Sequence, residues 1–298
     1  MSRRRELEQH RHRLNETREI INSMRALAFM ETRKLASFLD AQRAVVAHIH
    51  TVAEDFFSFY PEALPQRTLP QQTSPQQILP QTEKTTQVYL LLGSERGFCG
   101  DFNESLLPAM AADQTRNHIS QPWIIATGNK LSIRLEANLQ RTILLQGTSM
   151  VEEIEKTLVQ IVDTLSELQI QNGGISLTIV HHDPDQDGVL ATQILPPFES
   201  LRDTTPQFTQ LPLLNLTPGR FCAELIDRYL FSSLHEIMYL SLMAENQRRV
   251  THLEHAVQQL DDKSAALLRR GNRLRQEEIT EEIEVILLSA AGFQHPQY

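Results

Sequence analysis

Three glycines stand close together in residues 93–101, which read Gly-Ser-Glu-Arg-Gly-Phe-Cys-Gly-Asp. They follow an apolar run and precede a helical pattern, which is where loops that bind phosphate occur. The glycine spacing fits neither the dinucleotide pattern GxGxxG nor the P-loop pattern GxxxxGK[ST]. We therefore favour a turn that lets backbone segments pack closely over a nucleotide site.

A second candidate for chemistry is the acidic segment 183–188, Asp-Pro-Asp-Gln-Asp-Gly. Alternate carboxylates are the first half of an EF-hand calcium loop, but Ile194 stands at the twelfth position, where that loop needs a bidentate glutamate. The segment is better interpreted as a solvated turn.

The histidines and cysteines show no pattern of a metal or catalytic site. Two cysteines without a CxxC pair exclude a disulfide framework and a zinc knuckle, and Cys99 has no partner base at a recognisable spacing. No HExxH motif accompanies the histidine pairs, so we expect solvated or interfacial histidines and neither metal nor cofactor. The pairs are His48 with His50, His181 with His182, and His252 with His255.

The composition sets the class of protein. The chain has 298 residues, of which 41% are hydrophobic and 22% charged, as in folded globular proteins. A net charge of −9 provides no basic field for nonspecific nucleic-acid binding. The sequence has no apolar run of membrane-spanning length, so direct membrane insertion is not expected. The basic start, Met1 to Arg5, leads straight into glutamates and is interpreted as part of a helix, not as a targeting segment.

One long helix is predicted from about Arg3 to Phe59, because neither proline nor glycine occurs before Pro61. Two apolar stripes of heptad spacing are expected on it, the second three residues after the first. The arginines of this helix are expected on its solvated face. The first stripe is Leu7, Leu14, Ile21, Ala28, Leu35, Ile49 and Phe56; the second is Thr17, Met24, Phe38, Val45, Val52 and Phe59.

A second long helix is predicted from Gly219 to Ala291, after the N-cap signal Thr217-Pro218. Its seam consists of leucines seven residues apart, with Ser264 and Gly271 as thin places. Neither helix can bury its seam alone, so the simplest arrangement is an antiparallel coiled coil between the two ends of the chain. The alternative is two separate dimerising helices. The seam leucines are Leu253, Leu260, Leu267 and Leu274.

The middle of the chain predicts a small Rossmann-like α/β domain. Apolar runs at 88–92, 123–126 and 175–180 are expected to be strands, and Asp187-Gly188 predicts a hairpin to a further strand at 189–195. Helical patterns at 103–113, 129–139 and 150–168 alternate with them, which favours a parallel sheet. The predicted organisation is therefore α/β: a coiled-coil helix (1–60), a Pro/Gln-rich linker (61–87), the α/β domain (88–200), a connector (201–218) and a second coiled-coil helix (219–298).

The C-terminal helix carries an unusual polar face. Residues 272, 275, 276, 279 and 280 share one side of it, and they include Arg275, Gln276 and Thr280. A mixed polar stripe of this kind is typical of a surface that contacts a partner.

Three motifs resemble the gamma subunit of F-type ATP synthases, the central rotor shaft. Residues 14–26 (LNETREIINSMRA) are similar to the family pattern I-x-N-T-x-K-I-T-x-A-M-K, and residues 93–103 (GSERGFCGDFN) resemble S-D-R-G-L-C-G-G-F-N. Residues 272–282 (NRLRQEEITEE) resemble N-x-x-R-Q-x-x-I-T-x-E, while Glu245 and Arg249 fit the upstream S-E-x-x-A-R-M. Asp101 departs from the family pattern by replacing a glycine.

The resemblance implies an asymmetric axle inside a ring of alpha and beta subunits, with the α/β domain beside epsilon and the membrane c-ring. It implies no active site on this chain and a peripheral place at the cytoplasmic face of the cell membrane. The family's contacts with beta would fall on Met24, Arg25, Glu245, Arg249, Arg275, Gln276 and Thr280.

Two other classes of function stay open on the sequence. One is a coiled-coil tether whose α/β head binds an independent partner, which predicts homodimers. The other is an enzyme using the glycine segment near Cys99, which predicts nucleotide binding by the monomer.

Overall fold

The computed structural model describes residues 3–64, 85–135, 141–186, 188–198, 201 and 210–292. The chain divides into two compact units. Unit 1 consists of residues 1–28 and 250–298, and unit 2 of residues 29–249. Most of the predicted linker and connector, residues 65–84 and 202–209, lies outside the described residues.

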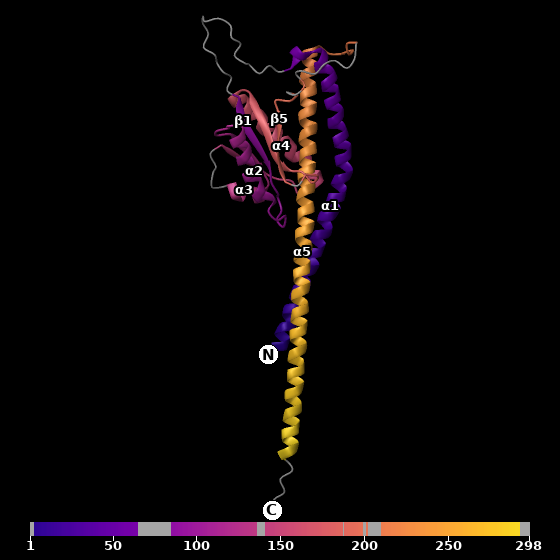
Figure 1. Cartoon of the computed structure of the whole chain (residues 1–298), viewed down its shortest axis with the longest axis vertical. Coiled ribbons are helices and arrows are strands. Elements are labelled where there is room, and N and C mark those ends of the chain that lie inside the picture. Colours follow the sequence, from indigo (N-terminus) through magenta and orange to yellow (C-terminus); the bar gives the residue numbers. More distant parts are fainter. Residues whose placement is uncertain are drawn as a thin grey trace, which may run out of the picture. The chain divides into compact units, whose positions relative to one another are not determined.

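The two predicted long helices are confirmed. Helix α1 covers Arg3–Phe59 and helix α5 covers Pro218–Gly292, and each runs through both units (Figure 1). The first turn of α5 forms where expected, since the backbone N–H of Phe221 donates to the carbonyl of Thr217 at 2.9 Å. None of the helices in the described part of the chain has an apolar stretch long enough to cross a membrane.

In unit 1, α1 and α5 pair as an antiparallel coil. Arg25 forms an ion pair with Glu254 at 3.8 Å, and Arg18 forms one with Asp261 at 2.5 Å. Seven residues down one helix therefore match seven residues up the other, which is the register of an antiparallel heptad pair. The two helices thus pack their seams against each other within one chain. These paired seams are not available for the alternative of two separate dimerising helices.

The second apolar stripe of α1 was predicted wrongly by one residue. Phe38 and Val45 are 44% and 47% exposed, whereas Leu39 is 2% exposed. The second inward-facing row begins four residues after Leu7, not three. Leu39 and Ala53 in this row are buried, and its other members are half-buried: Arg11, Arg18, Arg25, Thr32 and Val46. Both spacings occur in a heptad seam. Because three members of the row are arginines, it does not stand out as an apolar stripe in the sequence.

Unit 2 contains a five-stranded mixed sheet in the order β3-β2-β1-β4-β5. The first four strands are parallel, and β5 pairs with β4 in the antiparallel direction, as the hairpin signal predicts. The Rossmann-like α/β class is confirmed; strand β3 was not predicted. The strands are β1 (Thr86–Leu92), β2 (Trp123–Thr127), β3 (Thr142–Leu145), β4 (Ile175–His182) and β5 (Val189–Leu195).

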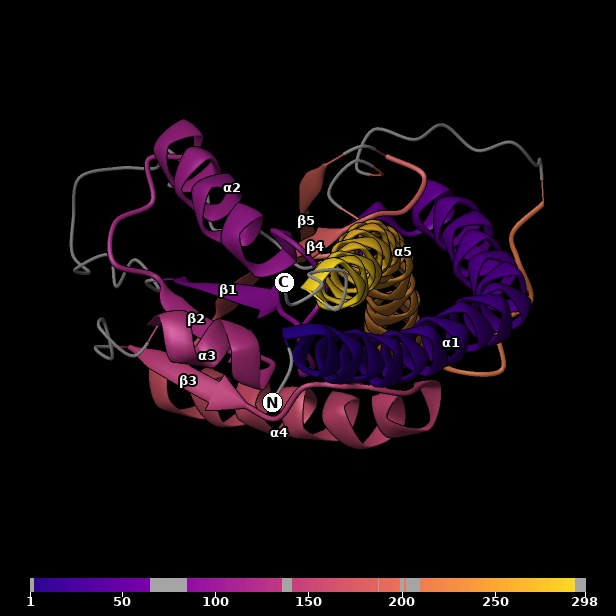
Figure 2. The same ribbon diagram turned by 90° about the horizontal axis from the view of Figure 1, so that it is seen from below.

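Helices cover both faces of this sheet (Figure 2). On one face α2 (Phe102–Arg116) and α3 (Asn129–Leu135) pack on Tyr89 and Leu91 of β1. On the other face α4 (Ile154–Asn172) and the unit 2 parts of α1 and α5 pack on Val88, Leu90 and Leu92. The alternation along β1 follows from the two-residue period of a strand. Two short 3-10 helices complete the unit, Pro61–Ala63 and Val151–Glu153.

The acidic segment after β4 is a turn, as expected. The backbone N–H of Asp185 donates to Asp183 Oδ1 at 2.9 Å, and the Asp185 carboxylate pairs with Arg43 of α1 at 2.5 Å. Among the described residues, no group of acidic, His or Cys side chains is arranged to hold a metal ion. His181 and His182 are 2% and 1% exposed, so these two histidines are core residues, and expecting them in solvent or at an interface was wrong.

Candidate functional site

Backbone segments pack closely against one another at the glycine segment after β1. A Cβ atom on Gly93 would lie 2.4 Å from Leu131 Cβ, and one on Gly128, whose φ is +95°, would lie 2.5 Å from the Gly93 carbonyl oxygen. Only glycine fits at such distances. The close-packed turn predicted from the sequence is therefore confirmed.

Little free space remains where a doubly wound sheet would bind a nucleotide, at the carboxyl ends of its strands. The cavity at Gly93 and Thr127 has a volume of about 10 Å³ and is closed by Met238, Ser241 and Glu245 of α5. A space of this size holds about one water molecule. Helix α5 thus covers this edge of the sheet.

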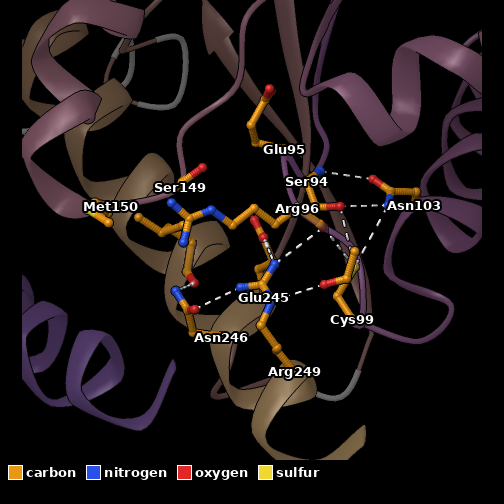
Figure 3. A network of polar contacts seen from close by, with 12 residues as sticks. Ser94, Glu95, Arg96, Cys99, Asn103, Ser149, Met150, Glu245, Asn246 and Arg249 are labelled. Carbon is orange, nitrogen blue, oxygen red and sulfur yellow. Dashed lines mark hydrogen bonds and ion pairs between the residues drawn. The ribbon is translucent and has the colours of Figure 1, made fainter. Parts of the chain in front are cut away.

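Three buried side chains fix the start of the loop (Figure 3). Asn103 accepts a hydrogen bond from the Ser94 backbone N–H at 2.9 Å and donates to Ser94 Oγ at 2.8 Å. The Cys99 thiol donates to the same hydroxyl at 3.3 Å. Burial raises the pKa of the Cys99 thiol, so it stays neutral and lacks the thiolate character of a nucleophile.

Glu95 ties this loop to the loops after β2 and β3. Its Oε2 atom accepts hydrogen bonds from the backbone N–H groups of Asn129 and Gly147, both at 3.0 Å. Asn129 opens α3, so the carboxylate also lies at the positive end of a helix. One side chain thereby joins three strand ends.

Arg249 of α5 supports the other half of the loop from below (Figure 3). Its Nε–H donates to the Gly97 carbonyl at 3.1 Å, and its Nη2–H donates to the Arg96 carbonyl at 3.3 Å. Its Nη1–H donates to Asn246 Oδ1 at 2.8 Å. The guanidinium of Arg249 therefore supports the turn at residues 96–97. Its counter-charge lies on the same face of α5.

That counter-charge is Glu245, one helical turn earlier, which pairs with Arg249 Nη2. Both residues are buried, at 2% and 6% exposure. Burial raises the pKa of Glu245 to about 7, although the Arg249 charge opposes the rise. The pair is thus an internal support of unit 2 and not an exposed contact in the isolated chain.

The other predicted contact residues lie in unit 1. Arg275, Gln276 and Thr280 are exposed on α5, and the Thr280 hydroxyl donates to the Gln276 carbonyl at 2.9 Å. On α1, Met24 is half-buried and Arg25 is held by Glu254. The seven predicted residues therefore lie in three places: Arg275, Gln276 and Thr280 on α5, Met24 and Arg25 beside Glu254, which precedes Arg275 by 21 residues on α5, and the buried pair in unit 2.

The row of seam arginines, Arg11, Arg18 and Arg25, was missed as a feature of the coil. Their seven-residue spacing was the available signal. This spacing alone does not indicate an interface, because arginines on a long helix are usually solvated.

Comparisons with known proteins agree with this architecture. The model of a family described as ATP synthase matches residues 3–292. The ATP synthase gamma chain of Clostridium beijerinckii (strain ATCC 51743 / NCIMB 8052) is 25% identical over 289 residues, which cover 93% of each chain.

Solved structures show the same fold at low identity. A chain of the Euglena gracilis mitochondrial ATP synthase (OSCP/F1/c-ring, rotational state 3) has a TM-score of 0.57 and 15% identity, with 99% of this chain and 97% of that chain covered. A chain of the Tetrahymena thermophila mitochondrial ATP synthase (central stalk/c-ring) has a TM-score of 0.55 and 16% identity, with 80% and 99% covered. The protein described here belongs to the gamma-subunit family of ATP synthases, the subunits of the central stalk.

Proposed function

We propose that the chain turns inside a ring of alpha and beta subunits and couples ion flow through a membrane c-ring to the conformational cycle of beta. Epsilon is the proposed partner of the α/β domain. The site of action is the cytoplasmic face of the cell membrane, where the chain is a peripheral component.

The observation that carries this proposal is the polar face of α5 in unit 1. Arg275, Gln276 and Thr280 are exposed there, on a helix whose seam is already used by α1. A rotor drives its partners only if each of its faces has a different contact energy with each state of beta. A polar face on one side of a helix pair supplies such an asymmetry, and its charges set register more than raw affinity.

Met24 and Arg25 are proposed to face an acidic segment of beta from the other helix. Glu245 and Arg249 are proposed to act on beta through the turn 96–97 that they support, since their own side chains are buried.

The test is ATP turnover by the complex assembled from this chain with alpha, beta and epsilon. The double variant Arg275→Ala and Gln276→Ala is expected to lower this ATP turnover about 10-fold, equivalent to about 1.4 kcal/mol. The helicity of the isolated chain should not change, because both side chains are exposed. Glu277→Ala with Glu281→Ala, at two other exposed positions of α5, is the control. Turnover equal to the wild type in the assembled double variant would refute the assignment of these residues.

A further inference from the structure

A cavity of about 160 Å³ lies between α1 and α5 in unit 1. Leu7 and Arg11 line it from α1, and Leu267, Gly271 and Arg275 line it from α5. Gly271 leaves open space on this side of α5, since a Cβ atom placed there would meet nothing within 4 Å. A water needs about 10–15 Å³ on the same measure, so the cavity has room for a carboxylate with part of its stem.

The register of the coil gives Arg11 a special position. Arg25 faces Glu254, and seven residues along, Arg18 faces Asp261. One further step of seven leads to Arg11 on α1 and to Leu268 on α5, so the partner carboxylate is replaced by an apolar side chain. Among the described residues, neither Arg11 nor Arg275 has a carboxylate partner.

The charge and the shape of this cavity therefore favour an anionic ligand. Two guanidinium groups and one carboxylate, Glu8, line the cavity, and Glu8 already has a contact of its own. Guanidinium binds carboxylate in a planar two-pronged geometry, which neither a neutral group nor a cation can match. Leucine at position 11 would pack better against Leu268 in the isolated coil. The contacts within the isolated chain thus do not explain why position 11 is an arginine.

We propose that this cavity receives an acidic side chain of the beta subunit, which binds between Arg11 and Arg275. The proposal rests on the rotor function above and adds to it a contact residue, Arg11, that lies outside the motifs carrying the family resemblance. It also gives Gly271 a function, since its missing side chain leaves the opening into which the partner inserts.

Two variants of the full-length chain test the proposal from opposite directions. Gly271→Met fills the cavity, and Arg11→Leu removes one guanidinium. Both are expected to leave the isolated coil equally or more resistant to heat, because a glycine leaves the helix in one and an apolar pair forms in the other. Both should nevertheless weaken binding of the chain to the purified ring of alpha and beta subunits at least about 10-fold.

Arg18→Leu and Arg11→Lys are the matched controls. The first changes an arginine of the same row that does not line the cavity, and should leave affinity within about twofold, since exposed ion pairs contribute little. The second keeps the charge and should retain most of the affinity. Wild-type affinity in both Arg11→Leu and Gly271→Met would overturn the proposal, whereas a wild-type chain that does not bind the ring would overturn the rotor function itself.

A free anion is the competing occupant. Inorganic phosphate, added to the isolated chain at constant ionic strength, is expected to leave its thermal unfolding unchanged. A saturable stabilisation that disappears in Arg11→Leu would show that the cavity binds a free anion, and would contradict the carboxylate proposal.

Discussion

Replacing Arg249 with methionine should strongly destabilise unit 2 while sparing unit 1. The substitution keeps most of the apolar stem but removes the charge that faces Glu245, which is only 2% exposed. It also removes the donors to Asn246 and to the carbonyls of Arg96 and Gly97. Breaking one half of a buried ion pair costs about 3–5 kcal/mol. Typical domains have a total free energy of unfolding of about 5–15 kcal/mol, so the effect would be large.

The double variant separates the pair from its surroundings. When Glu245→Gln is combined with Arg249→Met, no charge is left buried at this place. The double variant should therefore recover about 2 kcal/mol relative to Arg249→Met alone, within the range of coupling energies between contacting residues. Arg248→Met is the control, because Arg248 pairs with Asp101 at an exposed position and such pairs are worth about 1 kcal/mol or less.

The assay is urea unfolding at pH 8, followed by the fluorescence of Trp123. This is the only tryptophan of the chain, and it opens β2 in the sheet of unit 2. The shift of the midpoint, multiplied by the slope, gives the loss of unfolding free energy. A loss below about 1 kcal/mol in Arg249→Met, or a double variant no more stable than the single one, would refute the reasoning.

Two more predictions concern each unit separately. In unit 2 the pKa of Glu245 is about 7 in the folded chain, against an ordinary value of 4.5, so the folded state binds the proton more tightly. Its contribution to stability is fully present below about pH 4.5 and is lost as the pH rises through 7, by about 3 kcal/mol in all. Glu245→Gln should therefore gain stability relative to the wild type between pH 4.5 and 8 in the same fluorescence assay, and a constant difference would contradict the raised pKa. In unit 1, Leu260→Asp places a charge in the half-buried seam and should cost about 1–3 kcal/mol. Circular dichroism should show that the helix melts at a lower temperature, while the fluorescence of Trp123 stays unaffected. The control Gln259→Asp, at an exposed position, should melt like the wild type. Unchanged melting of Leu260→Asp would show that Leu260 does not belong to the seam.

The long helices and the sheet could be predicted because their signals are local. An absence of proline and glycine, heptad spacing, and apolar runs ending at glycine each specify an element without knowledge of its neighbours. Strand β3 was missed because it has only four residues, Thr142–Leu145, and none of them is buried. Its place comes from pairing with β2, which is a tertiary contact.

The arginine row of the seam and the buried pair Glu245–Arg249 could not be predicted from the sequence, for a different reason. A heptad row of arginines is compatible with both a solvated face and an interface, and only the carboxylates across the coil decide between them. Likewise, Glu245 and Arg249 at four-residue spacing match an ordinary surface pair of a helix. Their burial under the turn 96–97 depends on how the sheet packs against α5. The contact of the seven predicted residues with beta stays a prediction.

The central claim is that this chain works as the central-stalk subunit of a rotary ATP synthase. The most direct measurement is affinity capture of the tagged full-length chain from gently solubilised membranes of its source, with mass spectrometry and an ATPase assay on the eluate. We expect recovery of alpha, beta and epsilon subunits together with ATPase activity. A homodimer of the chain without these subunits would contradict the claim and favour a coiled-coil tether.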